Sequence, residues 1–234
     1  MINLDNLITV CYIDDRLDRN IERYINEFCI NLNKYTEGII DEFTYYDVEE
    51  KNLEVINFIE NKHIFSKYSF KFTRYNFNSE DSYKTLLDNE FVKNANIIII
   101  DSWLFENENS TLSKFTGEQF KIILRQILPF IKTIVISQNG GKNDSSTVEK
   151  WKGSGDAKAH YHEKLLPLLI NYIFGTIEEQ NILNQLSKDE EVDEFLVDTI
   201  KNTAAGLIDT ALFEKKDLDE LIRLFNEVKH HHDK

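Results

Sequence analysis

Apolar residues follow two different periods along most of this chain. Short runs of β-branched and aromatic residues predict strands. These runs occupy residues 7–13, 68–75, 97–100 and 133–136, with a weaker one at 146–152. Apolar residues spaced three and four apart predict amphipathic helices. That spacing covers residues 17–32, 53–64, 82–93, 117–128 and 157–174, while residues 39–46 fit either a short strand or a helical turn. Alternating strands and helices are typical of an α/β fold with a parallel sheet.

The central strand of this sheet is predicted at Ile97 to Ile100, where four branched aliphatic residues stand in a row. A strand with one face in water would alternate with polar residues, so this run indicates a strand buried on both faces. Ligands of open parallel sheets bind just past the carboxyl ends of the strands. Asp101 follows Ile100 directly and is therefore the first candidate functional residue.

Other polar residues follow the neighbouring predicted strands. Asp14 and Asp15 end the first one, Ser137 follows residues 133–136, and the weak strand would deliver Lys150 or Lys152. Carboxylates gathered at one edge repel each other, and Mg²⁺ is the hard cation that such oxygens bind. The set suits phosphoryl transfer, in which a metal and a lysine neutralise the phosphoryl oxygens while a carboxylate attacks phosphorus.

Each of these residues also has a plainer interpretation. Asp14 or Asp15 could cap the helix that follows, and Asp101 could be a strand-end turn residue. Either lysine could be a solvated surface charge. His160 and His162 fit packing better than metal binding, because residues two apart do not share a helix face.

The composition argues against some classes of binding partner. The net charge is −14 and the isoelectric point about 4.9, whereas nucleic-acid and anionic membrane surfaces need clustered Lys and Arg. No apolar run approaches a membrane span and no signal peptide pattern is present, so we expect a cytoplasmic protein. Cys11 and Cys29 lack the spacing of a zinc site and are expected to be small buried side chains.

Beyond Gly175 the pattern predicts helices alone. They cover residues 177–186, 192–203, 207–213 and 218–228. We therefore divide the chain into an α/β domain at 1–175 and an all-helical extension at 176–234. The extension has 15 Asp and Glu against 7 Lys and Arg, which argues against DNA reading and favours homodimerisation or binding of a protein partner. His230 to His232 could bind a metal weakly or be the remnant of an expression tag.

The ordered set of motifs resembles the receiver domain of bacterial response regulators. The motifs are Ile13-Asp14-Asp15, Ile100-Asp101, Gly117-Glu118, Ile136-Ser137 and a later Lys, within residues 7–174. The resemblance implies a flavodoxin-like sheet of parallel strands. It further implies that Asp14 and Asp15 hold Mg²⁺ together with Asp101 and the backbone carbonyl of Trp103. Asp101 would accept phosphate from a histidine kinase, Ser137 would be the switch hydroxyl, and Lys150 would pair with the phosphoryl group.

The chain also departs from the family pattern. Residues 32–93 are longer than the usual second strand with its flanking helices, and no helix is evident between Ser137 and the lysine. Trp151 stands where the family has Pro, which leaves Lys150 and Lys152 both open. The expected function is a phosphorylation-dependent signalling switch rather than a turnover enzyme. A pseudo-receiver that binds a partner without phosphorylation is the first alternative, and a metal-dependent nuclease or phosphatase, which an acidic surface disfavours, is the second.

Overall fold

The chain forms a five-stranded parallel sheet with the order β2-β1-β3-β4-β5. The computed structural model describes residues 6–16, 18–39, 65–78, 81–104, 116–138 and 145–186. The strands are β1 (Leu7–Asp14), β2 (Ser69–Asn76), β3 (Ile97–Asp101), β4 (Lys132–Ser137) and β5 (Thr147–Glu149). This order is the flavodoxin-like one, so the predicted fold class is confirmed.

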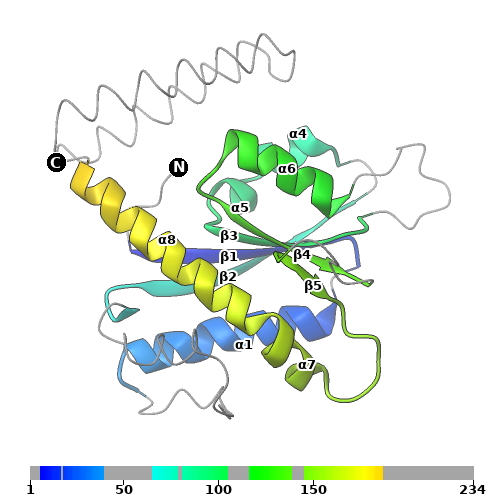
Figure 1. Cartoon of the computed structure of the whole chain (residues 1–234), viewed down its shortest axis with the longest axis horizontal. Coiled ribbons are helices and arrows are strands. Elements are labelled where there is room, and N and C mark those ends of the chain that lie inside the picture. Colours follow the sequence, from blue (N-terminus) through cyan, green and yellow to red (C-terminus); the bar gives the residue numbers. More distant parts are fainter. Residues whose placement is uncertain are drawn as a thin grey trace, which may run out of the picture. The chain divides into compact units, whose positions relative to one another are not determined.

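Helices cover both faces of the sheet (Figure 1). They are α1 (Arg19–Thr36), α4 (Tyr83–Asp88), α5 (Glu90–Lys93), α6 (Gly117–Ile127), α7 (Ala157–Lys164) and α8 (Leu166–Leu186). One apolar cluster joins residues of α1, α7 and α8 to one face, and a second joins residues of α4, α5 and α6 to the other. The sheet is therefore the middle layer of three.

The central position of β3 follows from its burial on both faces. Ile97 and Ile99 pack in the cluster with α1 and α8, whereas Ile98 and Ile100 pack in the cluster with α6. All four side chains are fully buried, as the sequence predicts. The neighbouring strands β1 and β4 pair with β3 in parallel, so the carboxyl ends of all three meet at one edge.

The start of α1 decides between two interpretations of the first acidic pair. The N-cap is Asp18, whose side chain accepts a hydrogen bond from the N–H of Asn20 at 2.9 Å. The alternative in which Asp14 or Asp15 caps this helix is therefore wrong. Asp14 instead accepts from the N–H of this N-cap residue at 3.2 Å and stays at the strand end.

Two predicted helices differ from the observed ones. The helix expected at 82–93 is interrupted at Asn89, whose backbone is extended and whose side chain caps α5 by accepting from the N–H of Phe91 at 2.8 Å. The helix expected to end at Phe174 continues through Gly175. A glycine costs a helix interior only about 1 kcal/mol. Burial of Ile173 and Ile177 on either side of it outweighs that cost.

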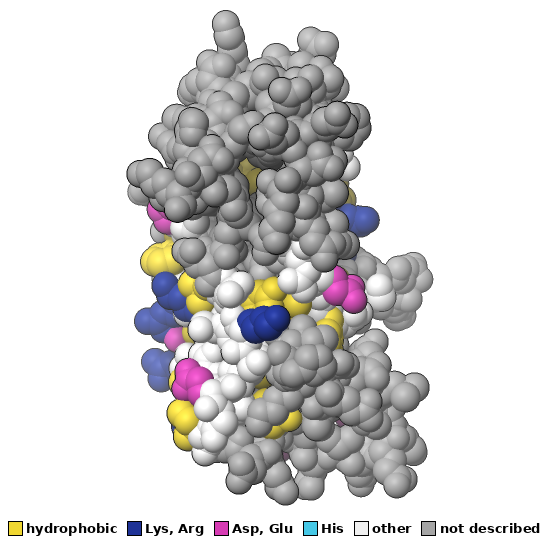
Figure 2. Space-filling view, turned by 90° about the vertical axis from the view of Figure 1, so that its left-hand side faces the viewer, with side chains coloured by type: hydrophobic (Ala, Val, Ile, Leu, Met, Phe, Trp, Pro, Cys, Tyr) yellow, Lys and Arg dark blue, Asp and Glu magenta, His cyan; other side chains and the backbone are white. Residues whose placement is uncertain are grey.

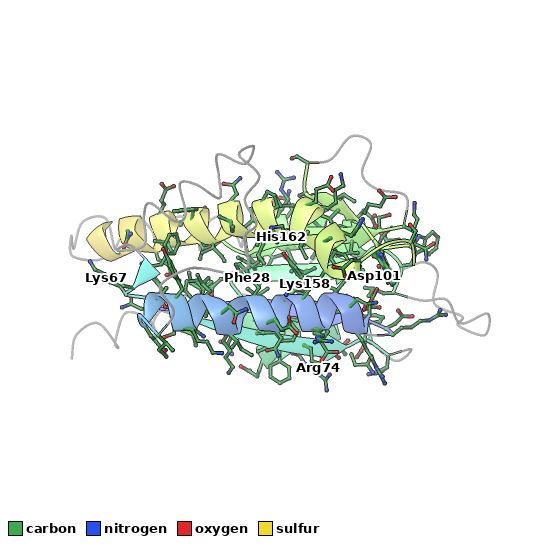
Figure 3. All side chains as sticks on the ribbon, turned by 90° about the horizontal axis from the view of Figure 1, so that it is seen from below. Phe28, Lys67, Arg74, Asp101, Lys158 and His162 are labelled. Carbon is green, nitrogen blue, oxygen red and sulfur yellow. The ribbon has the colours of Figure 1, made fainter. Side chains whose placement is uncertain are left out.

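The strands define two ends of the domain. Lys67, just before β2, marks the end where strands begin, and Asp101 marks the end where they finish (Figure 3). Figure 2 looks onto the end where the strands begin, and there the described Lys and Arg side chains lie beside Asp, Glu and apolar ones. The acidic residues of interest lie at the opposite end.

Residues Asp5–Ile177 form one compact unit, which contains the whole sheet. Predictions for residues 40–46, 53–64, the loop at 106–113, the helices beyond residue 186 and the terminal His run lie outside the described residues. The boundary at 175/176 and the role of the extension stay predictions. Within the described residues, the structure has no helix that combines the length and the apolar character needed to span a membrane.

Candidate functional site

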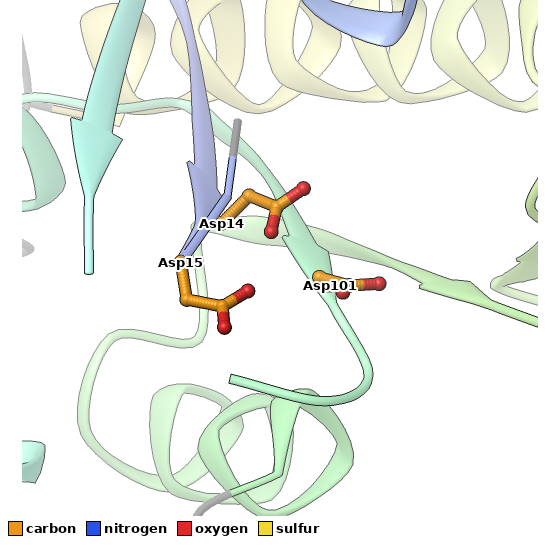
Figure 4. Close-up of side chains that lie close together, drawn as sticks. All are labelled: Asp14, Asp15 and Asp101. Atoms are coloured by element: carbon orange, nitrogen blue, oxygen red, sulfur yellow. The ribbon is translucent and has the colours of Figure 1, made fainter. Parts of the chain in front are cut away.

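Three carboxylates gather where β1 and β3 end. Asp14 is the last residue of β1, Asp15 follows it, and Asp101 is the last residue of β3. One carboxylate oxygen from each lies within 4.8 Å of the others (Figure 4). Asp14 and Asp101 are buried and Asp15 is half-buried. The sequence predicts this gathering, because adjacent parallel strands end at the same edge of the sheet.

Lys150 adds a positive charge to this cluster of carboxylates. It follows β5, and its backbone N–H donates to the carbonyl of Ser137 at 2.8 Å, which continues the pairing of β4 with β5. Its Nζ lies 3.2 Å from Oδ2 of Asp101 and 3.6 Å from Oδ2 of Asp14.

Lys152 is directed elsewhere. Its Nζ donates to Oε1 of Glu149 at 2.6 Å, and more than half of its side chain is exposed. Of the two lysines left open by the sequence, Lys150 is the one at the carboxylates. Residues two apart in a strand point to the same face of the sheet. Lys150 and Lys152 can point in different directions because both follow the end of β5, where this alternation no longer applies.

Asp14 is held by several donors. Its Oδ2 accepts from the hydroxyl of Tyr12 and from the N–H of Asp18 at 3.2 Å. Its Oδ1 accepts from the N–H of Arg16 at 3.1 Å. Although the side chain is fully buried, it is therefore well compensated as an anion.

The three carboxylates have different affinities for protons. Burial acts to raise the pKa of Asp14, but the hydrogen bond from Tyr12 and the charge of Lys150 outweigh it, so this pKa lies below its ordinary value. Burial raises the pKa of Asp15 to about 6, and the neighbouring Asp14 adds to the effect. Burial and the charge of Asp14 raise the pKa of Asp101 to about 7, against the influence of Lys150. Asp14 is thus ionised at neutral pH, whereas Asp15 and Asp101 have pKa values close to neutral pH.

The neighbouring carboxylates also change the pKa of Lys150. Burial acts to lower the pKa of Lys150, but the charges of Asp101 and Asp14 outweigh it and raise the pKa above its ordinary value. Lys150 therefore remains a cation. One lysine beside three carboxylates leaves an excess of negative charge once all are ionised, and a divalent cation would neutralise it.

The segment that follows Asp101 is fastened to the start of α6. The N–H of Gly117 donates to the carbonyl of Ser102 at 3.1 Å, and the hydroxyl of Ser102 donates to Oε1 of Glu118 at 2.6 Å. A Cβ at position 117 would lie only 2.5 Å from the backbone oxygen of Asp101. Gly117 is therefore required by the close approach of the helix to the strand end.

Ser137 and Trp103 also lie near this edge of the sheet. Ser137 ends β4 and is buried, and its carbonyl accepts a hydrogen bond from the backbone N–H of Lys150. Trp103 forms an antiparallel bridge with Thr116, and half of its side chain is exposed. The switch role of Ser137 and the metal-binding role of the Trp103 carbonyl stay predictions.

Sequence reasoning missed Tyr12 and the Ser102–Glu118 contact. Tyr12 stands two residues before Asp14, and this spacing places both side chains on one face of β1. The Tyr-x-Asp pattern was therefore a usable signal. The Ser102–Glu118 contact joins residues 16 apart, and only the packing of α6 against β3 brings them together.

The donor set fits a hard cation. All three candidate ligands are carboxylate oxygens, the type that Mg²⁺, Ca²⁺ and Mn²⁺ prefer. Within the described part of the chain, this is the one group of three or more Asp, Glu, His or Cys side chains gathered closely enough to hold an ion. His160 instead places Nε2 2.7 Å from the carbonyl oxygen of Glu149. The cluster is thus a candidate site for a hard divalent cation.

Comparison with known proteins gives no relative. No family model matches the chain, and neither does any curated protein or solved structure. The receiver-like arrangement therefore stands on the fold and on the acidic cluster alone.

Proposed function

We propose that this protein is a phosphorylation-controlled signalling switch in which Asp101 is the Mg²⁺-dependent phosphoacceptor. The observation that carries the proposal is the position of Lys150, whose Nζ lies 3.2 Å from Oδ2 of Asp101 at an edge that also presents Asp14 and Asp15. A cation beside a central carboxylate, with two more carboxylates available for a metal, is the arrangement needed for phosphoryl transfer.

The chemistry follows from the charges of these side chains. One oxygen of ionised Asp101 would form a bond to the phosphorus of the donor, while the bond from phosphorus to the donor's nitrogen or oxygen breaks and its electron pair leaves with the donor. Asp14 and Asp15, with Asp101, would hold Mg²⁺, which neutralises charge on the phosphoryl oxygens. Lys150 would bind one of those oxygens, and Ser137 would report the phosphoryl group through its hydroxyl.

The proposal also covers the phosphate donor and the signalling output. The donor would be a histidine kinase or a small acyl phosphate, and the output would be a protein contact made by the domain or by the extension at 176–234, including homodimerisation. The net charge of −14 supports protein partners over nucleic acid or anionic membranes, and a cytoplasmic setting fits this function.

A pseudo-receiver is favoured by one specific observation. Only nine residues, 138–146, connect the parallel strands β4 and β5. A crossover that includes a helix normally needs a dozen or more residues. This connection is shorter than such a crossover, and this departure from the receiver pattern favours partner binding that does not depend on phosphate.

Intact-mass analysis after incubation with Mg²⁺ and acetyl phosphate tests the proposal. Wild type should gain one labile phosphoryl group, and Asp101→Asn should gain none. Asp81→Asn is the matched control, because Asp81 is another buried Asp but accepts from Tyr75 and Asn78 instead of lying at the cluster. Absence of the adduct in wild type would overturn phosphoacceptance and favour the pseudo-receiver, whereas release of phosphate from esters or cleavage of nucleic acid would favour a hydrolase.

A further inference from the structure

Tyr12 brings a hydroxyl into a part of the core where an aliphatic side chain would suffice. It lies on the same face of β1 as Ile8 and Val10, and it is fully buried in the cluster that α1, α7 and α8 form with the sheet. A buried phenol needs a hydrogen-bond partner. The hydroxyl of Tyr12 donates to Oδ2 of Asp14, and the enclosed ring keeps the donor aimed at that oxygen.

The acceptor positions of Asp14 are nearly all in use. A carboxylate has about four such positions, two on each oxygen. On Oδ2 the hydroxyl of Tyr12 and the N–H of Asp18 occupy both. On Oδ1 the N–H of Arg16 occupies one. Nζ of Lys150 lies 3.6 Å from Oδ2 as well, so the remaining position on Oδ1 is the one left for a divalent cation.

We propose that Tyr12 is a positioning residue, which fixes Asp14 so that Oδ1 alone is presented to a divalent cation beside Asp15 and Asp101. The inference rests on the proposed function only in that this function requires a bound divalent cation. Hydrogen bonds behind a metal ligand fix its orientation before the metal arrives, and their loss typically costs roughly 10–100-fold in metal affinity. The competing explanation is that Tyr12 is a core aromatic residue whose hydroxyl merely finds an acceptor.

Tyr12→Phe in the full chain separates the two explanations. Titration with Mg²⁺, followed by calorimetry and tryptophan fluorescence, should show affinity weaker than in wild type by roughly 10–100-fold. The readout is metal affinity itself, so it does not depend on whether the protein accepts a phosphoryl group.

Tyr75→Phe is the matched control. The hydroxyl of Tyr75 donates to Oδ1 of Asp81 at 2.9 Å, so this variant also removes one Tyr–Asp hydrogen bond, but away from the cluster. It should keep wild-type Mg²⁺ affinity. Equal Mg²⁺ affinity in the two variants, with only a lower melting temperature for Tyr12→Phe, would show a purely structural role and overturn the inference.

The result can be separated from the outcome for phosphorylation. Weaker Mg²⁺ binding by Tyr12→Phe in a protein that takes no phosphoryl group would uphold the role of Tyr12 and overturn phosphoacceptance. A wild-type protein that binds neither Mg²⁺ nor Mn²⁺ would overturn the role of Tyr12 itself.

Wild-type protein provides a second measurement if Tyr12→Phe does not fold. The hydroxyl proton of Tyr12, assigned in NMR spectra through contacts with assigned neighbours, should persist when Mg²⁺ saturates the site, because its bond to Oδ2 of Asp14 is kept. Loss of that resonance on adding Mg²⁺ would mean that Oδ2 changes partner, and it would overturn the inference.

Discussion

Replacing Asp101 by Asn should stabilise the metal-free protein, and by an amount that depends on pH. Burial and the neighbouring charge of Asp14 raise the pKa of Asp101 from 3.8 to about 7, despite Lys150. The folded protein therefore binds this proton more tightly than the unfolded chain does. Its stability falls as pH rises from about 4 to about 7 and then levels off. Asn keeps the size of the side chain and removes the ionisation.

The expected size of the effect follows from the two pKa values. With about 1.4 kcal/mol for each pKa unit, the raised pKa of Asp101 lowers the stability of the folded protein by about 4 kcal/mol at pH 8 and about 2 kcal/mol at pH 5, relative to its stability at low pH. The gain in unfolding free energy of Asp101→Asn over wild type should thus be about 2–3 kcal/mol larger at pH 8 than at pH 5.

Urea denaturation in the presence of a chelator, followed by tryptophan fluorescence, measures this difference. Both tryptophans, Trp103 and Trp151, belong to the compact unit Asp5–Ile177, so the signal reports on the domain that contains the site. Asp81→Asn should instead lower stability, because Asp81 accepts two hydrogen bonds at the end of β2. The reasoning would be refuted if Asp101→Asn had no larger unfolding free energy than wild type at pH 8, or if this difference did not become smaller toward pH 5. Burial and the charge of Asp14 would then not disfavour ionisation of Asp101.

Three further outcomes test the same site. Mg²⁺ affinity by calorimetry should fall by about tenfold or more between pH 8 and pH 5.5, because Asp15 and Asp101, with pKa values of about 6 and about 7, must lose their protons to bind it; a flat pH profile would contradict this. Lys150→Met should abolish phosphorylation by acetyl phosphate and destabilise the fold at pH 8 by about 3 kcal/mol, since it leaves buried carboxylates without their cation, whereas Lys152→Met should match wild type in both assays. Gly117→Ala should lower the urea midpoint by an amount equivalent to about 1–3 kcal/mol, because its Cβ would lie 2.5 Å from the Asp101 carbonyl oxygen; wild-type stability would show that the helix can shift away at little cost.

Without a metal, the site thus has an excess of negative charge, which a bound cation would neutralise. Asp14 is compensated by Tyr12 and by backbone N–H groups, and Asp101 shares the positive charge of Lys150 with it. Groups arranged to bind a ligand are often poorly satisfied without it, and stability is lost in exchange for function. The raised pKa values of Asp15 and Asp101 express the same fact.

The sequence by itself determined the layers of the fold and the edge that carries the acids. Period-two and unbroken apolar runs predict strands, because side chains alternate across a sheet, and the run Ile97 to Ile100 predicts the central strand, because burial on both faces leaves no place for a polar residue. Parallel neighbours end at one edge, so the order of the residues is enough to group Asp14, Asp15 and Asp101. These signals are local and need only the residue order.

Tertiary structure alone decided which side chains meet. Lys150 and Lys152 look alike in the sequence, and only the pairing of β5 with β4 turns Lys150 to Asp101 and leaves Lys152 with Glu149. The break at Asn89 and the continuity of α8 through Gly175 likewise depend on capping and packing that local propensity does not contain. Propensities differ by about 1 kcal/mol or less per residue, and burial of neighbouring apolar side chains exceeds that readily. Long-range contacts therefore overrule the local signal wherever the two disagree.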